Sequence, residues 1–328
     1  MRTVIGNIAC REMMLDTRVP DIKLYARNKY LADRRGFGAE RTVLYIHGAT
    51  FPSETAFDLR LDGVSWMDYI ALHGYDVWLL DVRGYGRSSW PAEMYDEPHK
   101  HAPLVRGETA LEDMQTVIEF IRRDRGVNSI TLIGWSRGAV LAAAYTVRHR
   151  DHVNGLVFYA PIWTHVLDAP VAPRPESLGA YRLVEADYIS ERWHAAVPNS
   201  DRDEVIDETW CRSWIDTTWS TGKVRGDHEV KHLRVPNGLV QDGLDYEWAG
   251  HSYYDPAQIR VPSFLVAAEW DRTATPKKVR SLCGALVNAP FRQYVKVQRG
   301  SHWLMLERNR FELFRYVQQF LEQRGLYC

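Results

Sequence analysis

Short apolar runs alternate along the chain with longer stretches in which apolar residues recur every three or four positions. The short runs predict buried strands at residues 42–47, 76–81, 129–134, 155–160, 261–267 and 292–297. Helical spacing occurs at 111–124, 137–149 and 303–323, and the capping-box pattern Thr109-x-x-Glu112 stands at the start of the first. Strands that alternate with helices are typical of α/β proteins, in which helical crossovers join parallel strands.

The first thirty residues have a different pattern. Alternating patches around 19–21 and 22–25 predict an antiparallel hairpin at one edge of the sheet. The sequence therefore predicts a mostly parallel, doubly wound sheet with a short antiparallel addition.

The alternation of strands and helices stops between residues 162 and 255. Half of the twelve tryptophans lie in this stretch, namely Trp163, Trp193, Trp210, Trp214, Trp219 and Trp248. We expect a mainly helical cap at 162–255, inserted between two parts of one sheet domain at 1–161 and 256–328. Acidic residues outnumber basic ones in the cap, which disfavours a polyanionic substrate.

Composition narrows the class of function. With 328 residues, 45% of them hydrophobic and 25% charged, the chain resembles an ordinary globular protein. A net charge of −1 gives no general attraction to nucleic acid or to an anionic membrane. We find neither an apolar run long enough to span a membrane nor an N-terminal signal segment. The expectation is a cytoplasmic protein that acts on a small molecule, with an oligomeric state that the sequence leaves open.

A candidate nucleophile stands at the corner between a predicted strand and a predicted helix. The motif is Gly134-Trp135-Ser136-Arg137-Gly138. Gly-x-Ser-x-Gly is a weak signal alone, but at a strand-to-helix turn it is typical of a serine held in strained backbone geometry. The hydroxyl then projects beyond the carboxyl ends of the strands, where open α/β sheets place their sites.

A serine hydroxyl needs a base, and that base needs an orienting acid. Asp271 follows the predicted strand at 261–267, and His302 follows the last strand, so each lies in the loop where the Ser–acid–His chain order places it. Asp271 could instead cap the next helix, and Glu269 is a competing carboxylate that we expect to be structural. We expect Ser136, Asp271 and His302 to form a catalytic triad.

Oxyanion donors are expected on two loops. One is the backbone N–H of Arg137, and the other is the N–H of Ala49, after the strand at 42–47. We interpret His47 as a structural residue of its own loop. The pair His99 and His101 has no third ligand nearby in the sequence, and the four scattered cysteines (Cys10, Cys211, Cys283 and Cys328) form no metal motif. We therefore expect no metal and no cofactor, and interpret the cysteines as packing residues.

These motifs resemble those of the α/β-hydrolase fold superfamily. The matching segments are residues 47–50, 81–88, 134–138, 269–276 and 300–302. The resemblance implies Ser136 as nucleophile, His302 as general base and acid, and Asp271 as the residue that orients His302. Within the superfamily, the serine at position 136 separates the chain from branches with an aspartate nucleophile, such as epoxide hydrolases and haloalkane dehalogenases. The chain departs from the pattern in having HGAT where many lipases have HGGG, and Ala268 where glycine is frequent.

The resulting expectation is a serine hydrolase of a small to medium carboxylic ester with an apolar or aromatic group. Phe51, Trp135, Trp163 and Trp303 are the candidate substrate contacts, although tryptophans could equally hold the cap to the sheet. Amides, lactones, activated C–C bonds, acyl transfer to an acceptor other than water, and a non-catalytic receptor are the alternatives. We expect the Arg137 side chain to pair with Glu269.

Overall fold

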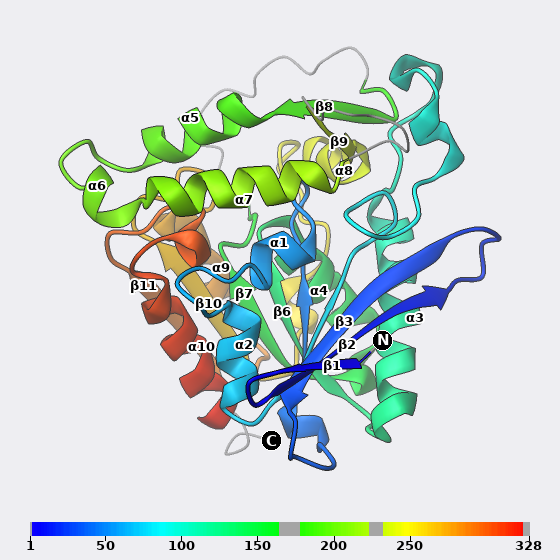
Figure 1. The fold of residues 1–328 in the computed structure, drawn as a ribbon, viewed down its shortest axis with the longest axis vertical. Helices are drawn as coiled ribbons and strands as arrows, with labels where there is room; N and C mark the ends of the chain where they lie inside the picture. Colours follow the sequence, from blue (N-terminus) through cyan, green and yellow to red (C-terminus); the bar gives the residue numbers. More distant parts are fainter. Residues whose placement is uncertain (1, 164–177, 223–231, 324–328) are drawn as a thin grey trace.

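The structure is a computed structural model that describes residues 2–163, 178–222 and 232–323. Nine strands of the described chain form one sheet in the order β1-β2-β3-β5-β4-β6-β7-β10-β11 (Figure 1). Their bounds are β1 Arg2–Ile5, β2 Ile8–Asp16, β3 Lys23–Leu31, β4 Thr42–Ile46, β5 Asp76–Leu80, β6 Ile130–Trp135, β7 Val153–Tyr159, β10 Ser263–Ala268 and β11 Arg292–Val297.

The six strands from β5 to β11 are parallel, as predicted, and each begins and ends within two residues of its predicted bounds. Every residue of β4, β5, β6 and β10 is buried, because helices cover both faces of the parallel part of the sheet. β10 begins at Ser263 because Pro262 has no N–H to donate to a neighbouring strand.

The predicted N-terminal hairpin is confirmed. β2 and β3 pair antiparallel across a turn at residues 17–22, in which the Ile22 N–H donates to the Val19 carbonyl at 3.3 Å. β1 extends this edge, and β3 joins the hairpin to β5 in antiparallel fashion.

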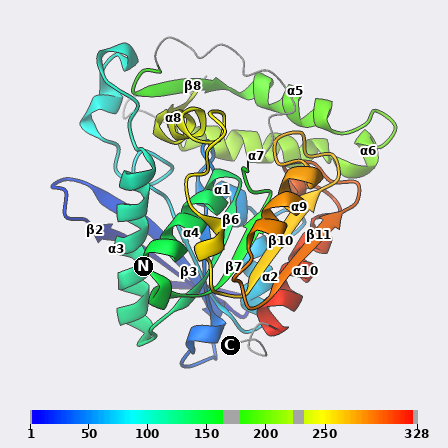
Figure 2. The ribbon, with the colours of Figure 1, turned by 180° about the vertical axis from the view of Figure 1, so that it is seen from behind.

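Helices lie on both faces of the sheet. α2 (Trp66–Leu72) and α10 (Arg310–Gln323) lie on the face turned toward the viewer in Figure 1, and α4 (Arg137–Arg148) and α9 (Pro276–Ala285) cover the face seen in Figure 2. α3 (Gly107–Arg125) packs beside α4, and the short α1 (Ser53–Phe57) follows β4. The predicted helix at 303–323 is a 3-10 turn at Leu304–Leu306 followed by α10.

The predicted start of α3 is wrong. The helix begins at Gly107, so Thr109 and Glu112 lie inside it, and its N-cap Arg106 makes no side-chain cap. The carboxylate of Asp242, which lies far away in the sequence, accepts the Gly107 N–H at 2.5 Å and replaces the local cap.

The inserted region lies over the carboxyl ends of the parallel strands (Figure 1). Its described elements are β8 Tyr181–Glu185, α5 Ala186–Ala196, α6 Arg202–Val205, α7 Glu208–Ser220, β9 His232–Pro236 and α8 Gly238–Asp245. Helices dominate, as predicted, but β8 and β9 pair as an antiparallel ribbon that the sequence did not indicate. The domain boundaries at 162 and 255 stay a prediction.

Two further expectations concern membrane-spanning segments and the cysteines. None of the helices in the described ranges is long and apolar enough to cross a membrane. Cys10, Cys211 and Cys283 are free thiols, and Cys328 lies outside the described residues.

Candidate active site

Ser136 occupies a strained corner between β6 and α4. Its φ of 57° and ψ of −120° lie in a region that residues with a side chain rarely adopt, and its N–H donates to the Tyr159 carbonyl at 2.9 Å. A Cβ on Gly138 would lie 2.3 Å from the Ile46 carbonyl oxygen, and one on Gly134 would lie 2.5 Å from the Gly138 carbonyl oxygen. The two glycines of the motif are therefore required by close backbone contacts around the serine.

The loop after β4 lies directly against this corner. β4 pairs with β5 on one side and β6 on the other, so the chain reverses its direction of winding there, where α/β sheets form their crevices. A Cβ on Gly48 would lie 3.4 Å from the Ser136 Cβ. The Ala49 carbonyl that follows accepts hydrogen bonds from the Tyr85 hydroxyl at 3.1 Å and from Arg182 Nη2 at 2.8 Å. These bonds fix the orientation of the loop expected to supply one oxyanion donor.

Arg137 is the first residue of α4, immediately after Ser136. The first N–H groups of a helix have no acceptor within the helix, and the helix dipole makes that end favourable for negative charge. The Arg137 N–H therefore has the character expected of an oxyanion donor.

Asp271 and His302 are hydrogen-bonded as the sequence predicts. The His302 Nδ1 lies 2.7 Å from Asp271 Oδ2, and the Asp271 side chain is fully buried. The other carboxylate oxygen, Oδ1, accepts the N–H groups of Thr273 and Ala274 at 2.8 Å each. The carboxylate thus accepts hydrogen bonds from three donors. Because Nδ1 keeps the proton that it donates in the bond to Asp271, Nε2 is the basic nitrogen of the ring.

The loops that carry these residues are fixed to one another. The Trp270 N–H donates to the Gly300 carbonyl at 2.8 Å, which joins the Asp271 loop to the His302 loop. The His302 carbonyl accepts from Trp135 Nε1 at 3.2 Å and from the Tyr159 hydroxyl at 3.1 Å. The residue before the nucleophile therefore positions the histidine, a role for Trp135 that the sequence left open.

Ser136 and His302 line a common cavity of about 150 Å³, here called the inner cavity. Of the four predicted substrate contacts, Phe51, Trp135 and Trp303 line it. Trp163 does not. It is buried and packs against Tyr254 with ring centroids 6.3 Å apart.

Two further lining residues, Ile189 and Arg192, come from α5 in the insert. Sequence reasoning missed both because nothing in the local pattern shows which face of a cap helix points toward the sheet.

Tryptophans of the insert attach it to the catalytic loops. Trp193 stacks on Trp303 with centroids 5.9 Å apart, and Trp214 contacts Phe51 edge-on at 4.8 Å. Trp193 Nε1 also donates to the buried carboxyl of Glu307 at 3.0 Å. Trp193 and Trp214 are buried without lining the inner cavity, so their role is packing.

The predicted pairing of Arg137 with Glu269 is wrong. The Arg137 guanidinium forms two parallel hydrogen bonds with Glu247, Nη1 to Oε1 at 2.8 Å and Nη2 to Oε2 at 2.7 Å. Both side chains are buried, at 5% and 4% exposure. Glu269 instead accepts the Arg299 N–H at 2.9 Å. Glu247 follows α8, so the pair joins the insert to the residue after the nucleophile.

Loss of this pair is expected to destabilise the protein strongly. Glu247→Ala leaves the Arg137 guanidinium buried without its partner, which typically costs about 3–5 kcal/mol. The matched control is Asp245→Ala, which removes one of the two carboxylate partners of the 40% exposed Arg106 and should cost less than about 1 kcal/mol. Urea unfolding measures both. Equal small losses for the two variants would contradict the assignment of Glu247.

His47 is structural, as expected, and both ring nitrogens are used. Nδ1 lies 2.7 Å from the Gly48 carbonyl, to which it donates, and Nε2 accepts the Val82 N–H at 3.1 Å. This pattern requires the neutral ring. Complete burial lowers the pKa of His47 to about 4.

Acid is therefore expected to destabilise the loop after β4. Unfolded His47 binds a proton near pH 6.5 and the folded form only near pH 4, so the free energy of unfolding falls as pH decreases through this window, by up to about 3 kcal/mol. In His47→Gln this contribution is absent. Urea unfolding at pH 7 and pH 5 should show that the wild type loses more stability than the variant, and parallel losses would refute the prediction.

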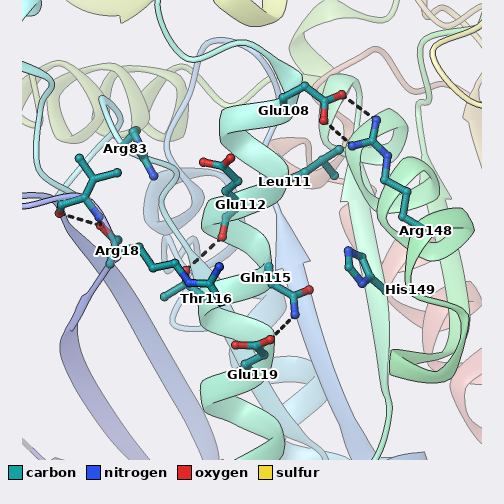
Figure 3. Close-up of a pocket in the computed structure, with 12 residues that line it drawn as sticks. Arg18, Arg83, Glu108, Leu111, Glu112, Gln115, Thr116, Glu119, Arg148 and His149 are labelled. Atoms are coloured by element: carbon teal, nitrogen blue, oxygen red, sulfur yellow. Dashed lines mark hydrogen bonds and ion pairs between the residues drawn. The ribbon is translucent and has the colours of Figure 1, made fainter.

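A larger groove of about 390 Å³ lies elsewhere, along α3 (Figure 3). Among its charged side chains, Glu108 pairs with Arg148, and Arg83 pairs with the buried Asp113. Neither Ser136 nor His302 lines it. Although this groove is larger than the inner cavity, none of the predicted triad residues lines it.

The described ranges contain no group of three His, Cys, Asp or Glu side chains that could hold a metal ion. His99 lies beside Glu97 at 3.2 Å, and His101 lies beside Asp96 at 3.1 Å. These histidines form ordinary surface pairs.

Known proteins of similar sequence or structure include several hydrolases. Epoxide hydrolase 3 of Xenopus tropicalis is 25% identical over 296 residues, which cover 86% of this chain and 71% of that protein. The human (lyso)-N-acylphosphatidylethanolamine lipase is 35% identical over 82 residues, covering 25% of this chain and 21% of the lipase. The structure of a serine hydrolase involved in carbazole degradation superposes with a TM-score of 0.62 at 16% identity, over 96% of this chain and 100% of that one.

The structural match, at this low identity, shows the fold alone. The model of one family, serine aminopeptidase S33, matches residues 39–309, which is most of the chain. The chain therefore belongs to the serine aminopeptidase S33 family and is a hydrolase with the α/β-hydrolase fold.

Proposed function

We propose that the protein is a serine esterase that cleaves a small to medium carboxylic ester through an acyl-enzyme. The observation that carries the proposal is the Asp271–His302 hydrogen bond of 2.7 Å, on a cavity that His302 shares with the strained Ser136. An orienting acid, a base and a nucleophile held at a strand-to-helix turn are the requirements for activating a serine hydroxyl.

In the first half-reaction the Ser136 Oγ attacks the ester carbonyl carbon and its proton passes to His302 Nε2. The carbonyl oxygen becomes an oxyanion, which the N–H groups of Ala49 and Arg137 stabilise. The C–O bond to the alcohol then breaks, and His302 gives its proton to the leaving oxygen. Asp271 stabilises the imidazolium between the two transfers.

In the second half-reaction water takes the place of the alcohol. His302 accepts a proton from the water as its oxygen attacks the acyl carbon, and then returns that proton to Ser136 as the acid leaves. Bond making and breaking balance with an ester and water as the only reactants.

The inner cavity limits the group bound next to Ser136. Its volume is about 150 Å³, and an apolar cavity of about this size elsewhere holds a benzene molecule. Phe51, Trp135 and Trp303 supply aromatic walls. We therefore propose that one side of the ester bond is a short acyl chain or a single aromatic ring.

A panel of esters, lactones and amides graded by size tests the proposal. We expect turnover of aryl esters with acyl groups up to one ring in size, and a steep loss of kcat/KM for longer acyl chains. Product analysis with a competing alcohol distinguishes the alternative of acyl transfer, because more new ester than free acid would overturn the assignment to hydrolysis. Absence of turnover across the whole panel would overturn the proposed esterase activity.

A further inference from the structure

A second, larger cavity adjoins the inner cavity. This outer cavity has a volume of about 510 Å³ and lies along β8 and the start of α5. The two cavities share Thr50, Ile189 and Arg192 as lining residues. A molecule that reaches Ser136 through the outer cavity would therefore pass the side chain of Arg192.

The outer cavity contains two arginines and one carboxylate. Arg192 is exposed and lies over the ring of Tyr188, with its guanidinium carbon 5.6 Å from the ring centroid. Glu185 is paired with His232 at 3.4 Å. With Arg182, these groups give the lining a formal charge of +1 when His232 is neutral.

Arg182 is a structural cation at the base of this cavity. Its guanidinium donates to the Ala49 carbonyl at 2.8 Å, to the Thr50 hydroxyl at 2.9 Å and to the Pro236 carbonyl at 3.0 Å. The acceptors that it contacts among the described residues are neutral, and burial lowers its pKa. Its charge is therefore incompletely compensated, which makes the neighbourhood of Arg192 more favourable for an anion.

The geometry points to a monoanionic substrate, namely an ester that carries one carboxylate. Arg192 binds this carboxylate in the outer cavity while the ester group lies in the inner cavity. The guanidinium fork matches a carboxylate in two parallel hydrogen bonds, which makes arginine well suited to this recognition. A lining of charge +1 that also contains Glu185 favours a carboxylate over a phosphate dianion. The inference rests on the proposed esterase function.

The test compares two aryl esters of equal length, whose acyl chains are within the size limit proposed above and end in a carboxylate and in a carboxamide. We expect the wild type to prefer the carboxylate ester. In Arg192→Gln the kcat/KM of the carboxylate ester relative to that of the carboxamide ester should fall about 10- to 100-fold, chiefly because the KM of the carboxylate ester rises. This range corresponds to the contribution of a hydrogen bond to a charged group, about 1.5–3 kcal/mol. Arg192→Lys should retain part of the preference.

Arg212→Gln is the matched control. Arg212 is an exposed arginine of α7 that lines neither cavity, so this variant changes the net charge equally and should leave the ratio unaltered. The same ratio in Arg192→Gln and the wild type would overturn the inference while leaving the esterase proposal intact. A preference for a phosphate-ended ester over the carboxylate would overturn the assignment to a monoanion. Failure of the wild type on both esters and on the neutral panel would instead reject the esterase activity.

Discussion

Replacement of Ser136 by alanine is expected to lower kcat for every ester that the wild type hydrolyses by about 10⁶-fold, the effect of removing a triad serine. The variant retains the cavity and the Asp271–His302 pair but has no oxygen to form the acyl-enzyme. Steady-state rates on an aryl ester measure the loss. A loss of less than about 100-fold would contradict the assignment of Ser136 as the nucleophile.

Loss of folding is not the expected source of this effect. Alanine has the same Cβ as serine, so the strain at a φ of 57° is unchanged, and the Ser136 N–H keeps its bond to Tyr159. The free energy of unfolding of the variant should therefore match that of the wild type within about 1 kcal/mol. Urea unfolding provides this control.

Asp271→Asn is expected to lower kcat by about 10⁴-fold, as the corresponding change does in another serine hydrolase. Asp271 Oδ1 accepts two backbone N–H groups, so the asparagine oxygen must take that position and its amide nitrogen must face His302. The His302 Nδ1 would then have to accept a hydrogen bond, and its proton would move to Nε2. The imidazole would be held in the tautomer that cannot take the proton of Ser136.

Glu269→Gln is the matched control for the acid, because Glu269 is the competing carboxylate on the same loop. It accepts the Arg299 N–H and lies 3.5 Å from Lys296, and neither contact includes His302. We expect a change in kcat of less than about tenfold. A larger loss in Glu269→Gln than in Asp271→Asn would reverse the assignment of the orienting acid.

The sheet and the loops that carry chemistry could be predicted because their signals are local. A buried parallel strand is a continuous apolar run, and Ser136 directly follows one while Asp271 lies in the loop after another. His302 lies in the loop after β11, whose residues are mostly exposed or half-buried. The chain order of nucleophile, acid and base then restricts the candidates to these three positions and to Glu269, the competing carboxylate on the Asp271 loop.

Features that depend on distant contacts could not be predicted. The partner of Arg137 is Glu247, 110 residues away in the sequence, whereas the predicted partner Glu269 accepts the Arg299 N–H instead. The start of α3 is set by Asp242, 135 residues beyond Gly107. In both cases a side chain of the insert satisfies a polar group of the core, and no local pattern encodes how the insert lies on the sheet.

The tryptophans of the cap and of the catalytic loops illustrate the same limit. Their abundance suggested both packing and substrate contact, and tertiary structure separates the two roles. Trp193 and Trp214 pack on the residues that line the inner cavity, whereas Trp303 and Trp135 line it themselves. The sequence also gave no reason to select Ile189 and Arg192, which reach the cavity because one face of α5 is turned toward it.

The most direct test of the central claim is covalent labelling with a fluorophosphonate, followed by mass spectrometry of the intact protein and of its peptides. An activated serine displaces fluoride and forms a stable Oγ–P bond. We predict one label per chain, on the peptide that contains Ser136, and no label in Ser136→Ala. A label on any other residue, or an unlabelled wild type that retains esterase activity, would contradict Ser136 as the nucleophile.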